Sequence, residues 1–172
     1  MNLEKFGLIP LVNFGIITEG NDKTTVYRCA QPLFKYQYEW IKEHLGIKAI
    51  VNLRSEKNID PRFCDTLGIK TLTIDVPDRH APTLDQVKRF IEFIQKTDGP
   101  ILIHCEHGHG RTSTFSVISK LVDGLNLEWA IEDEKNRFHY NFKHHAQEEF
   151  LRSLDVNELF AKKSDTEQTV KN

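Results

Sequence analysis

The chain has 172 residues, of which 39% are hydrophobic, and a formal net charge of −2. This length and apolar content predict one globular domain with a buried core and exclude a disordered chain. The small net charge excludes a strongly basic nucleic-acid-binding surface, so we expect no nucleic-acid partner. No apolar run reaches the length of a membrane span, and the polar N-terminal residues do not form a secretory signal. We therefore expect a cytoplasmic protein.

Helical and extended patterns alternate along the chain. Apolar runs predict strands at residues 26–28, 47–53, 69–74 and 101–103. Amphipathic spacing with suitable end residues predicts helices at residues 36–45, 61–67, from the Thr83 cap to about 94, 111–123, 129–138 and 146–160. This order predicts an α/β fold with a central, mostly parallel sheet flanked by helices. Residues 1–160 are expected to form one domain and residues 161–172 a flexible polar tail.

The chain contains three cysteines, Cys29, Cys64 and Cys105. An odd number of cysteines without a secretory signal argues against a disulfide framework. Cys29 and Cys64 are therefore expected to be small buried hydrophobic residues. The alternative, in which one of them forms a transient disulfide with an oxidised Cys105, stays open.

The most specific feature is the stretch HCEHGHGRT, from His104 to Thr112. A strand is expected before it and a helix after it. A strand, a tight loop and a helix N-terminus direct successive backbone N–H groups at one point, which makes an anion site. In an α/β sheet such a loop lies at the carboxyl end of a strand, where these sheets bind ligands. The candidate phosphate-binding residues are Glu106, His107, Gly108, His109, Gly110 and Arg111.

The first and last positions of this loop carry the chemistry. Cys105 is the candidate nucleophile, because a helix N-terminus and cationic neighbours favour the thiolate that attacks phosphorus. Arg111 offers a planar, bidentate clamp for a phosphoryl group. His104 is expected to support the shape of the loop. Thr112 is expected to assist the sulfur as a leaving group.

A leaving alkoxide or phenoxide also needs a proton, and Asp78 is the candidate general acid. It follows the strand at 69–74 on a polar loop that can reach the carboxyl edge of the sheet. Asp75 is the reserve candidate, with a structural role expected at the strand end. Arg79 and His80 are candidates for contacts to a second phosphate of the substrate.

HCEHGHGRT matches the His-Cys-x5-Arg-Thr/Ser signature, so the chain resembles the dual-specificity branch of the protein tyrosine phosphatase superfamily. The stretches 13–15, 26–32, 45–48 and 52–56 are similar to atypical dual-specificity phosphatases of plants, fungi and bacteria. The loop, and the placement of Asp78 four residues before Pro82, are also similar to tyrosine-phosphatase-type phytases and phosphoinositide phosphatases. In these families that aspartate is the general acid, and the resemblance implies the same role for Asp78 and a dual-specificity-phosphatase-like fold.

These features predict a phosphomonoester hydrolase that acts through a cysteinyl-phosphate intermediate and needs no cofactor or metal. The expected substrate is a phosphotyrosyl or phosphoseryl/threonyl protein. An inositol polyphosphate is the alternative substrate, and a phospho-ligand binding module without turnover is a further alternative. The sequence leaves the oligomeric state open.

Several charged or metal-binding side chains allow two interpretations. The histidines and cysteine of the loop are also zinc ligands by type, although structural zinc sites usually pair ligands from two separate arms. Arg28 is either a brace for the loop or a solvated residue. Arg54 either touches substrate or pairs with Glu56. The acidic run 132–134 is most simply a solvated helix face.

Overall fold

The computed structural model describes residues 7–19, 24–56, 61–139, 142 and 145–160. A five-stranded sheet has the order β1-β2-β5-β3-β4. The strands are β1 (Gly15–Thr18), β2 (Val26–Ala30), β3 (Ala49–Arg54), β4 (Lys70–Val76) and β5 (Ile101–Cys105). β1 pairs antiparallel with β2, and the other neighbouring strands are parallel. The expected α/β fold with a mostly parallel sheet is confirmed.

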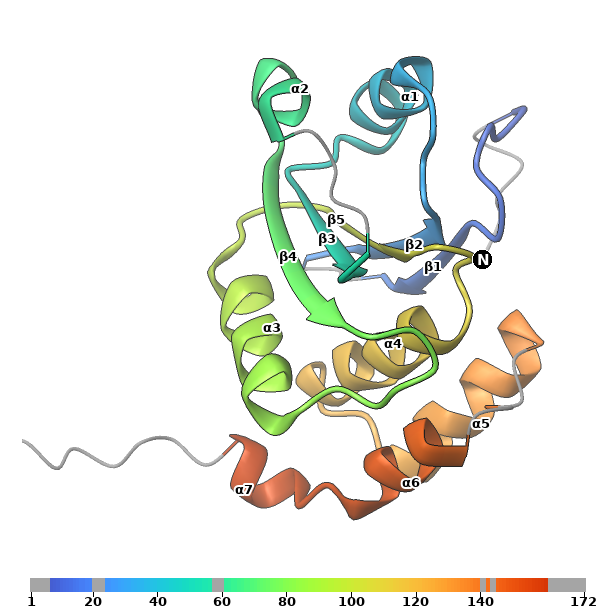
Figure 1. The fold of residues 1–172 in the computed structure, drawn as a ribbon, viewed down its shortest axis with the longest axis vertical. Helices are drawn as coiled ribbons and strands as arrows, with labels where there is room; N and C mark the ends of the chain where they lie inside the picture. Colours follow the sequence, from blue (N-terminus) through green and yellow to red (C-terminus); the bar gives the residue numbers. More distant parts are fainter. Residues whose placement is uncertain (1–6, 20–23, 57–60, 140–141, 143–144, 161–172) are drawn as a thin grey trace, which may run out of the picture.

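Helices cover both faces of the sheet (Figure 1). One face carries α1 (Lys35–Leu45) and α2 (Pro61–Thr66). The other face carries α3 (Leu84–Lys96), α4 (Gly110–Val122), α5 (Leu127–Phe138) and α6 (His145–Ser153), followed by α7 (Val156–Phe160). Among the described helices, none is long and apolar enough to cross a membrane.

The strand β5 shows why buried parallel strands appear as continuous apolar runs in the sequence. Successive side chains of a strand point to opposite faces. Ile101 and Ile103 belong to the core beneath α3 and α4, whereas Leu102 belongs to the core beneath α1. Because helices cover both faces, every one of these positions is buried and apolar.

One prediction about the elements is wrong, and one strand was not predicted. Residues 146–160 were expected to form a single helix, but α6 ends at Ser153 and α7 begins at Val156. The carboxylate of Asp155 accepts a hydrogen bond from the backbone N–H of Glu158 (3.0 Å), which is an N-cap that starts a new helix. The edge strand β1 was not expected. The tail predicted at residues 161–172 lies outside the described residues.

The topology determines where a ligand can bind. β2, β3, β4 and β5 run parallel, so their carboxyl ends meet at one edge of the sheet. β5 lies between β2 and β3, and α4 follows it directly on one face. The loop between β5 and α4 therefore lies in the middle of the edge at which open α/β sheets bind ligands.

Candidate active site

The loop from Cys105 to Arg111 closes tightly against strand β2. Cys105 ends β5 and is buried, and Arg111 lies in the first turn of α4. Gly108 has a φ of +71°, and a Cβ on this residue would lie 2.7 Å from the backbone nitrogen of Ala30. Only glycine permits both this backbone angle and this close approach.

Three consecutive carbonyl groups of the loop are each bound from outside the loop by a donor in the N-terminal part of the chain. The pairs are Glu106 with the backbone N–H of Gln31 (3.1 Å), His107 with the side-chain amide of Asn13 (2.6 Å), and Gly108 with the guanidinium of Arg28. In a planar trans peptide the C=O and the following N–H point in opposite directions. The outward carbonyls therefore turn the N–H groups of residues 107–109 toward the inside of the loop, as an anion site requires.

Arg111 connects the loop to the segments that follow β3 and β4. Its guanidinium is buried and forms a bidentate pair with Glu56, at 3.0 Å for each nitrogen–oxygen contact. The same guanidinium donates to the carbonyl of Val76 (3.0 Å) and lies 3.2 Å from the carboxylate of Asp78. The hydrogen bonds from Arg111 lower the pKa of Glu56 to about 2, so Glu56 is ionised at neutral pH.

Arg54 supports this arrangement from β3. Its side chain donates to Glu56 at 2.8 Å, lies 3.4 Å from the carboxylate of Glu106 and donates to the side chain of Gln31. Of the two interpretations of Arg54, the structure shows the ion pair with Glu56. Glu106, a candidate for phosphate binding, turns its side chain toward this arginine.

His104 and Thr112 are both fully buried beside the loop. The Nδ1 of His104 lies 3.2 Å from the carbonyl oxygen of Cys105, and since a carbonyl only accepts, this nitrogen carries the proton. Burial lowers the pKa of His104 to about 4, so the ring is neutral at physiological pH. Among the described residues, the hydroxyl oxygen of Thr112 has no hydrogen-bond partner.

The loop that carries Asp78 is fixed by two glutamines. Gln147 of α6 donates to the carbonyl of His80 (3.1 Å), and Gln86 of α3 donates to the carbonyl of Asp75 (2.8 Å). Asp75 lies within β4, whereas Asp78 lies on the loop beyond it and reaches Arg111. Asp78 is therefore the better placed of the two aspartates considered for the general acid.

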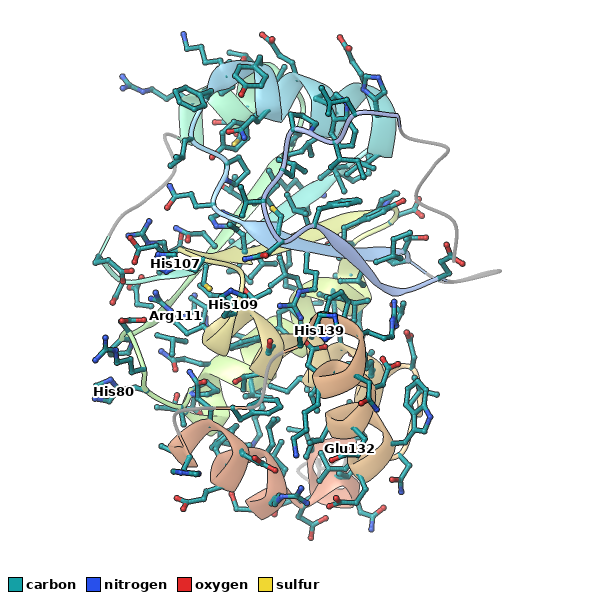
Figure 2. All side chains as sticks on the ribbon, turned by 90° about the vertical axis from the view of Figure 1, so that its right-hand side faces the viewer. His80, His107, His109, Arg111, Glu132 and His139 are labelled. Atoms are coloured by element: carbon teal, nitrogen blue, oxygen red, sulfur yellow. The ribbon has the colours of Figure 1, made fainter. Side chains whose placement is uncertain are left out.

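The remaining loop side chains lie at the mouth of the site. Figure 2 shows His80, His107, His109 and Arg111 along one side of the molecule, with Glu132 well away from them. His107, His109 and His80 are exposed. Arg79 is also exposed, lies 3.6 Å from Asp78 and has a φ of 64°, which is uncommon outside glycine.

One prediction about charged residues is wrong. Glu134, in the acidic run expected to be a solvated helix face, is completely buried and pairs with Arg28 and Lys120. Arg28 is buried as well, and of its two interpretations the structure shows the brace.

Among the described residues, no three side chains of the His, Cys, Asp and Glu types come together as a metal ion requires.

Asn13, Glu56 as the partner of Arg111, and Gln147 are among the residues of this arrangement that were not identified from the sequence. Each reaches the site from a distant segment. The only sequence signal was that Asn13 and Glu56 lie in stretches similar to known phosphatases. That similarity did not indicate what they contact.

The α/β fold and the loop from Cys105 to Arg111 are those of the protein tyrosine phosphatase superfamily. Comparisons with known proteins identify the family within it. Residues 7–153 match the family model described as DSP-PTPase phosphatase fused to NAD+ kinase, and the chain belongs to this family. The dual specificity protein phosphatase TpbA of Pseudomonas aeruginosa is 27% identical over 114 residues, which cover 63% of this chain and 49% of TpbA. Human dual specificity protein phosphatase CDC14A is 31% identical over 77 residues, which cover 45% of this chain and 13% of that protein. The chain therefore spans half or less of these two relatives.

Solved structures with the same fold include a phosphatase catalytic domain and Tk-PTP. The catalytic domain of the PP-IP phosphatase SIW14 from S. cerevisiae has a TM-score of 0.71 at 21% identity, covering 89% of this chain and 91% of that chain. Tk-PTP in its active form has a TM-score of 0.69 at 22% identity, covering 84% of this chain and 96% of that chain. The resemblance to atypical dual-specificity phosphatases is thus confirmed at the level of family and fold.

Proposed function

We propose that this chain is a cysteine-dependent phosphatase that hydrolyses phosphomonoesters through a cysteinyl-phosphate intermediate. The observation that supports this most is the loop itself. Cys105 stands at its entrance, its carbonyl groups face away from its centre, and Arg111 closes it in contact with Asp78. A bound phosphoryl group would meet a nucleophile, a ring of N–H donors and a guanidinium together.

The proposed reaction has two steps. In the first, the thiolate of Cys105 attacks phosphorus, a sulfur–phosphorus bond forms, and the bond to the leaving oxygen breaks. Asp78 gives its proton to that oxygen, while Arg111 and the N–H groups stabilise the charge on the phosphoryl oxygens. In the second, Asp78 takes a proton from water, the water oxygen attacks phosphorus, and the sulfur–phosphorus bond breaks to release phosphate.

Two buried residues have supporting roles in this proposal. Thr112 directly follows Arg111 in the chain. Its hydroxyl is available to donate to the sulfur of Cys105 as the second step releases that sulfur. The neutral ring of His104 binds the carbonyl of Cys105 and so fixes the peptide that carries the nucleophile. Neither the nucleophile nor the proton donor in this scheme requires a cofactor or metal.

For the substrate we favour a phosphorylated protein. Five of the large exposed hydrophobic residues lie in two segments that flank the loop: Leu8, Val12, Leu33, Phe34 and Tyr36. The two segments are joined to each other by a backbone bond from Ala30 to Val12 (2.8 Å), and to the loop by the bond from Gln31 to Glu106. A phosphopeptide bound at the loop can place apolar side chains on this surface, whereas an inositol polyphosphate has none to place.

An inositol polyphosphate remains the second candidate because histidines gather at the mouth. The ring N–H groups of His107, His109 and His80 are hydrogen-bond donors at this mouth, which suits a ligand with several phosphate groups. The carboxylates of Glu56, Glu106 and Asp78 at the same mouth oppose such a ligand. A phospho-ligand binding module without turnover is the third candidate, although binding alone requires neither a thiolate nor an acid.

The test compares hydrolysis of 4-nitrophenyl phosphate by the wild-type chain, Cys105→Ser and Cys64→Ser in the presence of EDTA. We expect activity in the wild type and in Cys64→Ser. The Cys64→Ser variant makes the same replacement of sulfur by oxygen, but in the core on the other face of the sheet. We expect none in Cys105→Ser, because a hydroxyl is a far weaker nucleophile at neutral pH. Unchanged activity in Cys105→Ser would contradict the mechanism, and a wild type inactivated by EDTA would contradict the metal-free scheme.

The same proteins, measured with physiological esters, decide the substrate class. Phosphate release is compared for a phosphotyrosine peptide with apolar flanking residues, a phosphothreonine peptide, inositol hexakisphosphate and NADP+. NADP+ is included because the family is described as fused to NAD+ kinase, whose product carries a phosphomonoester. We expect the highest kcat/KM with a peptide, and preference for a non-peptide ester would contradict the assignment to protein substrates.

A further inference from the structure

We propose that Glu134, on α5, is a positioning residue for the phosphate-binding loop and acts through the buried guanidinium of Arg28. This inference rests on the proposed function of the loop. It links the site to a helix that contributes none of the residues of the candidate active site. The link crosses the interior of the protein from α5 to β2 and from β2 to the loop.

Arg28 makes contacts in two directions. One terminal nitrogen, Nη2, donates to the carbonyl of Gly108 and to the hydroxyl of Ser113 (3.2 Å). The other, Nη1, forms an ion pair with Glu134. Both side chains are buried, at 1% and 0% exposure, so solvent does not compete for either contact. The planar guanidinium fixes the angle between its two nitrogens, and the carboxylate therefore sets the direction in which the other nitrogen donates.

Glu134 is itself fixed on its other side. Its second carboxylate oxygen accepts from the hydroxyl of Ser116 (2.6 Å) and from the ammonium of Lys120 (3.0 Å), both on α4. The ring of Phe138 lies 4.1 Å from the guanidinium of Arg28 and supports its flat face. Neither end of the Arg28–Glu134 pair is free to change its orientation without breaking another contact.

The orientation of Arg28 affects the site through one peptide group, the one that joins Gly108 to His109. Because Arg28 holds the carbonyl of Gly108 outward, the N–H of His109 in the same peptide points inward. If Arg28 turned away, this peptide could rotate, and the loop would lose one aligned donor to a phosphoryl oxygen. Burial lowers the pKa of Arg28 to about 10, so Arg28 stays charged at neutral pH, and its charge attracts a negatively charged sulfur at Cys105.

Stability alone does not account for this pair. A buried ion pair is often no more stabilising than apolar residues of the same volume. The position of α5 is already secured by apolar residues such as Ala130 and Ile131, which belong to the main core. Positioning of the loop is a role that apolar residues could not fill, because they offer no donor to Gly108.

The test uses Glu134→Gln, with Asp133→Asn as the matched control. Asp133 is the neighbouring acid, and it pairs with Lys120 (2.8 Å) and Arg137 (3.1 Å). Three quantities are measured: kcat, the affinity for inorganic phosphate, and the pH dependence of alkylation of Cys105 by iodoacetamide, followed on its peptide by mass spectrometry. For Glu134→Gln we expect kcat to fall by up to about 100-fold, phosphate to bind about tenfold more weakly, and alkylation to require a higher pH. For Asp133→Asn we expect all three to stay near the wild-type values.

A comparable loss of thermal stability in both variants, with phosphate affinity and alkylation unchanged in Glu134→Gln, would overturn the inference and leave a structural role. If Glu134→Gln does not fold, the double variant Arg28→Met with Glu134→Leu replaces the pair by apolar residues. We expect this protein to fold and to bind phosphate weakly, and wild-type affinity in it would also overturn the inference. Phosphate binding and alkylation need no turnover, so they decide this point even if the wild type hydrolyses no ester, which would contradict the proposed function alone.

Discussion

The guanidinium of Arg111 contacts two carboxylates, those of Glu56 and Asp78. Glu56 forms the bidentate pair along one edge, and Asp78 lies 3.2 Å from Nη2. Asp78 is 61% exposed and belongs to a surface loop, whereas Glu56 is also bound by Arg54. An incoming phosphoryl group therefore displaces Asp78 more easily than Glu56. In the proposed reaction the acid has to leave Arg111 before it can protonate the leaving group.

Asp78→Asn removes the proton but keeps the shape of the side chain. We expect kcat on phenyl phosphate, which has a poor leaving group, to fall by about 10²–10⁴-fold. The loss on 2,4-dinitrophenyl phosphate should be much smaller, because its leaving group needs no proton. Affinity for phosphate should be equal or higher, since the amide competes less for Arg111. Kinetics with the two esters measure this, and Asp75→Asn is the control expected to change neither.

Equal losses on both esters in Asp78→Asn would show that another residue supplies the proton. A large, leaving-group-dependent loss in Asp75→Asn would transfer the role to that residue, the reserve candidate. The two aspartates are three residues apart, and the structure distinguishes them by the contact of Asp78 with Arg111.

The elements differ in how far the sequence predicts them. Strands buried on both faces, such as β3 and β5, begin with apolar runs at residues 49–51 and 101–103, and the loop with its following helix is contiguous in the sequence. β1 is only four residues long and lies at the edge of the sheet, so its pattern is too short to indicate a strand. The break between α6 and α7 depends on a single capping side chain, Asp155.

The residues of the candidate site also differ in how far the sequence predicts them. Cys105 and Arg111 are identified by their spacing in one short motif. Asn13 contacts the loop across 94 positions of sequence, and Glu56 contacts Arg111 across 55. Such partners come together only through the tertiary fold, and no periodicity or local motif encodes the distance between them.

Helix α6 contributes to the site through one buried side chain. Gln147 is 1% exposed and donates to the carbonyl of His80, two residues after Asp78. Gln86 of α3 secures the start of the same loop at Asp75. The position of the acid therefore depends on how two helices pack against the sheet, whereas the nucleophile depends on β5 and α4.

Gln147→Leu keeps the buried volume but removes this donor. We expect a several-fold lower kcat on phenyl phosphate and little change on 2,4-dinitrophenyl phosphate, because a looser loop impairs protonation and not attack. In the Asp78→Asn background the same substitution should have almost no further effect, since both act on one step. A full additional loss in the double variant would mean that Gln147 acts elsewhere.

At the scale of the whole molecule, two ionisable groups near the site, His104 and Glu56, link folding to pH. His104 is neutral in the interior, with its pKa lowered by burial to about 4, against 6.5 for the free side chain. Glu56 has its pKa lowered to about 2 by its hydrogen bonds with Arg111. Both groups take up a proton more readily in the unfolded chain. Acid therefore favours unfolding, but each group acts in its own range of pH.

Above pH 6.5 His104 is neutral in both states and contributes no pH dependence. Between pH 6.5 and 4 the unfolded chain binds a proton that the folded chain does not, so the free energy of unfolding falls as the pH falls. The pKa difference corresponds to a total of about 3 kcal/mol, of which about 2 kcal/mol is lost by pH 5. The contribution of Glu56 is present above pH 4.5 and is lost only below it, so the interval from pH 7 to 5 isolates His104.

Urea denaturation of the wild type and of His104→Asn at pH 7 and pH 5 measures this contribution. The asparagine can still donate to the carbonyl of Cys105 but does not titrate, so its free energy of unfolding should fall by about 2 kcal/mol less than that of the wild type. His145→Asn, which changes an exposed histidine at the start of α6, should follow the wild type. If wild type and His104→Asn lose the same free energy between the two pH values, His104 is not held neutral in the folded protein, and its proposed part in fixing the nucleophile would have to be reconsidered.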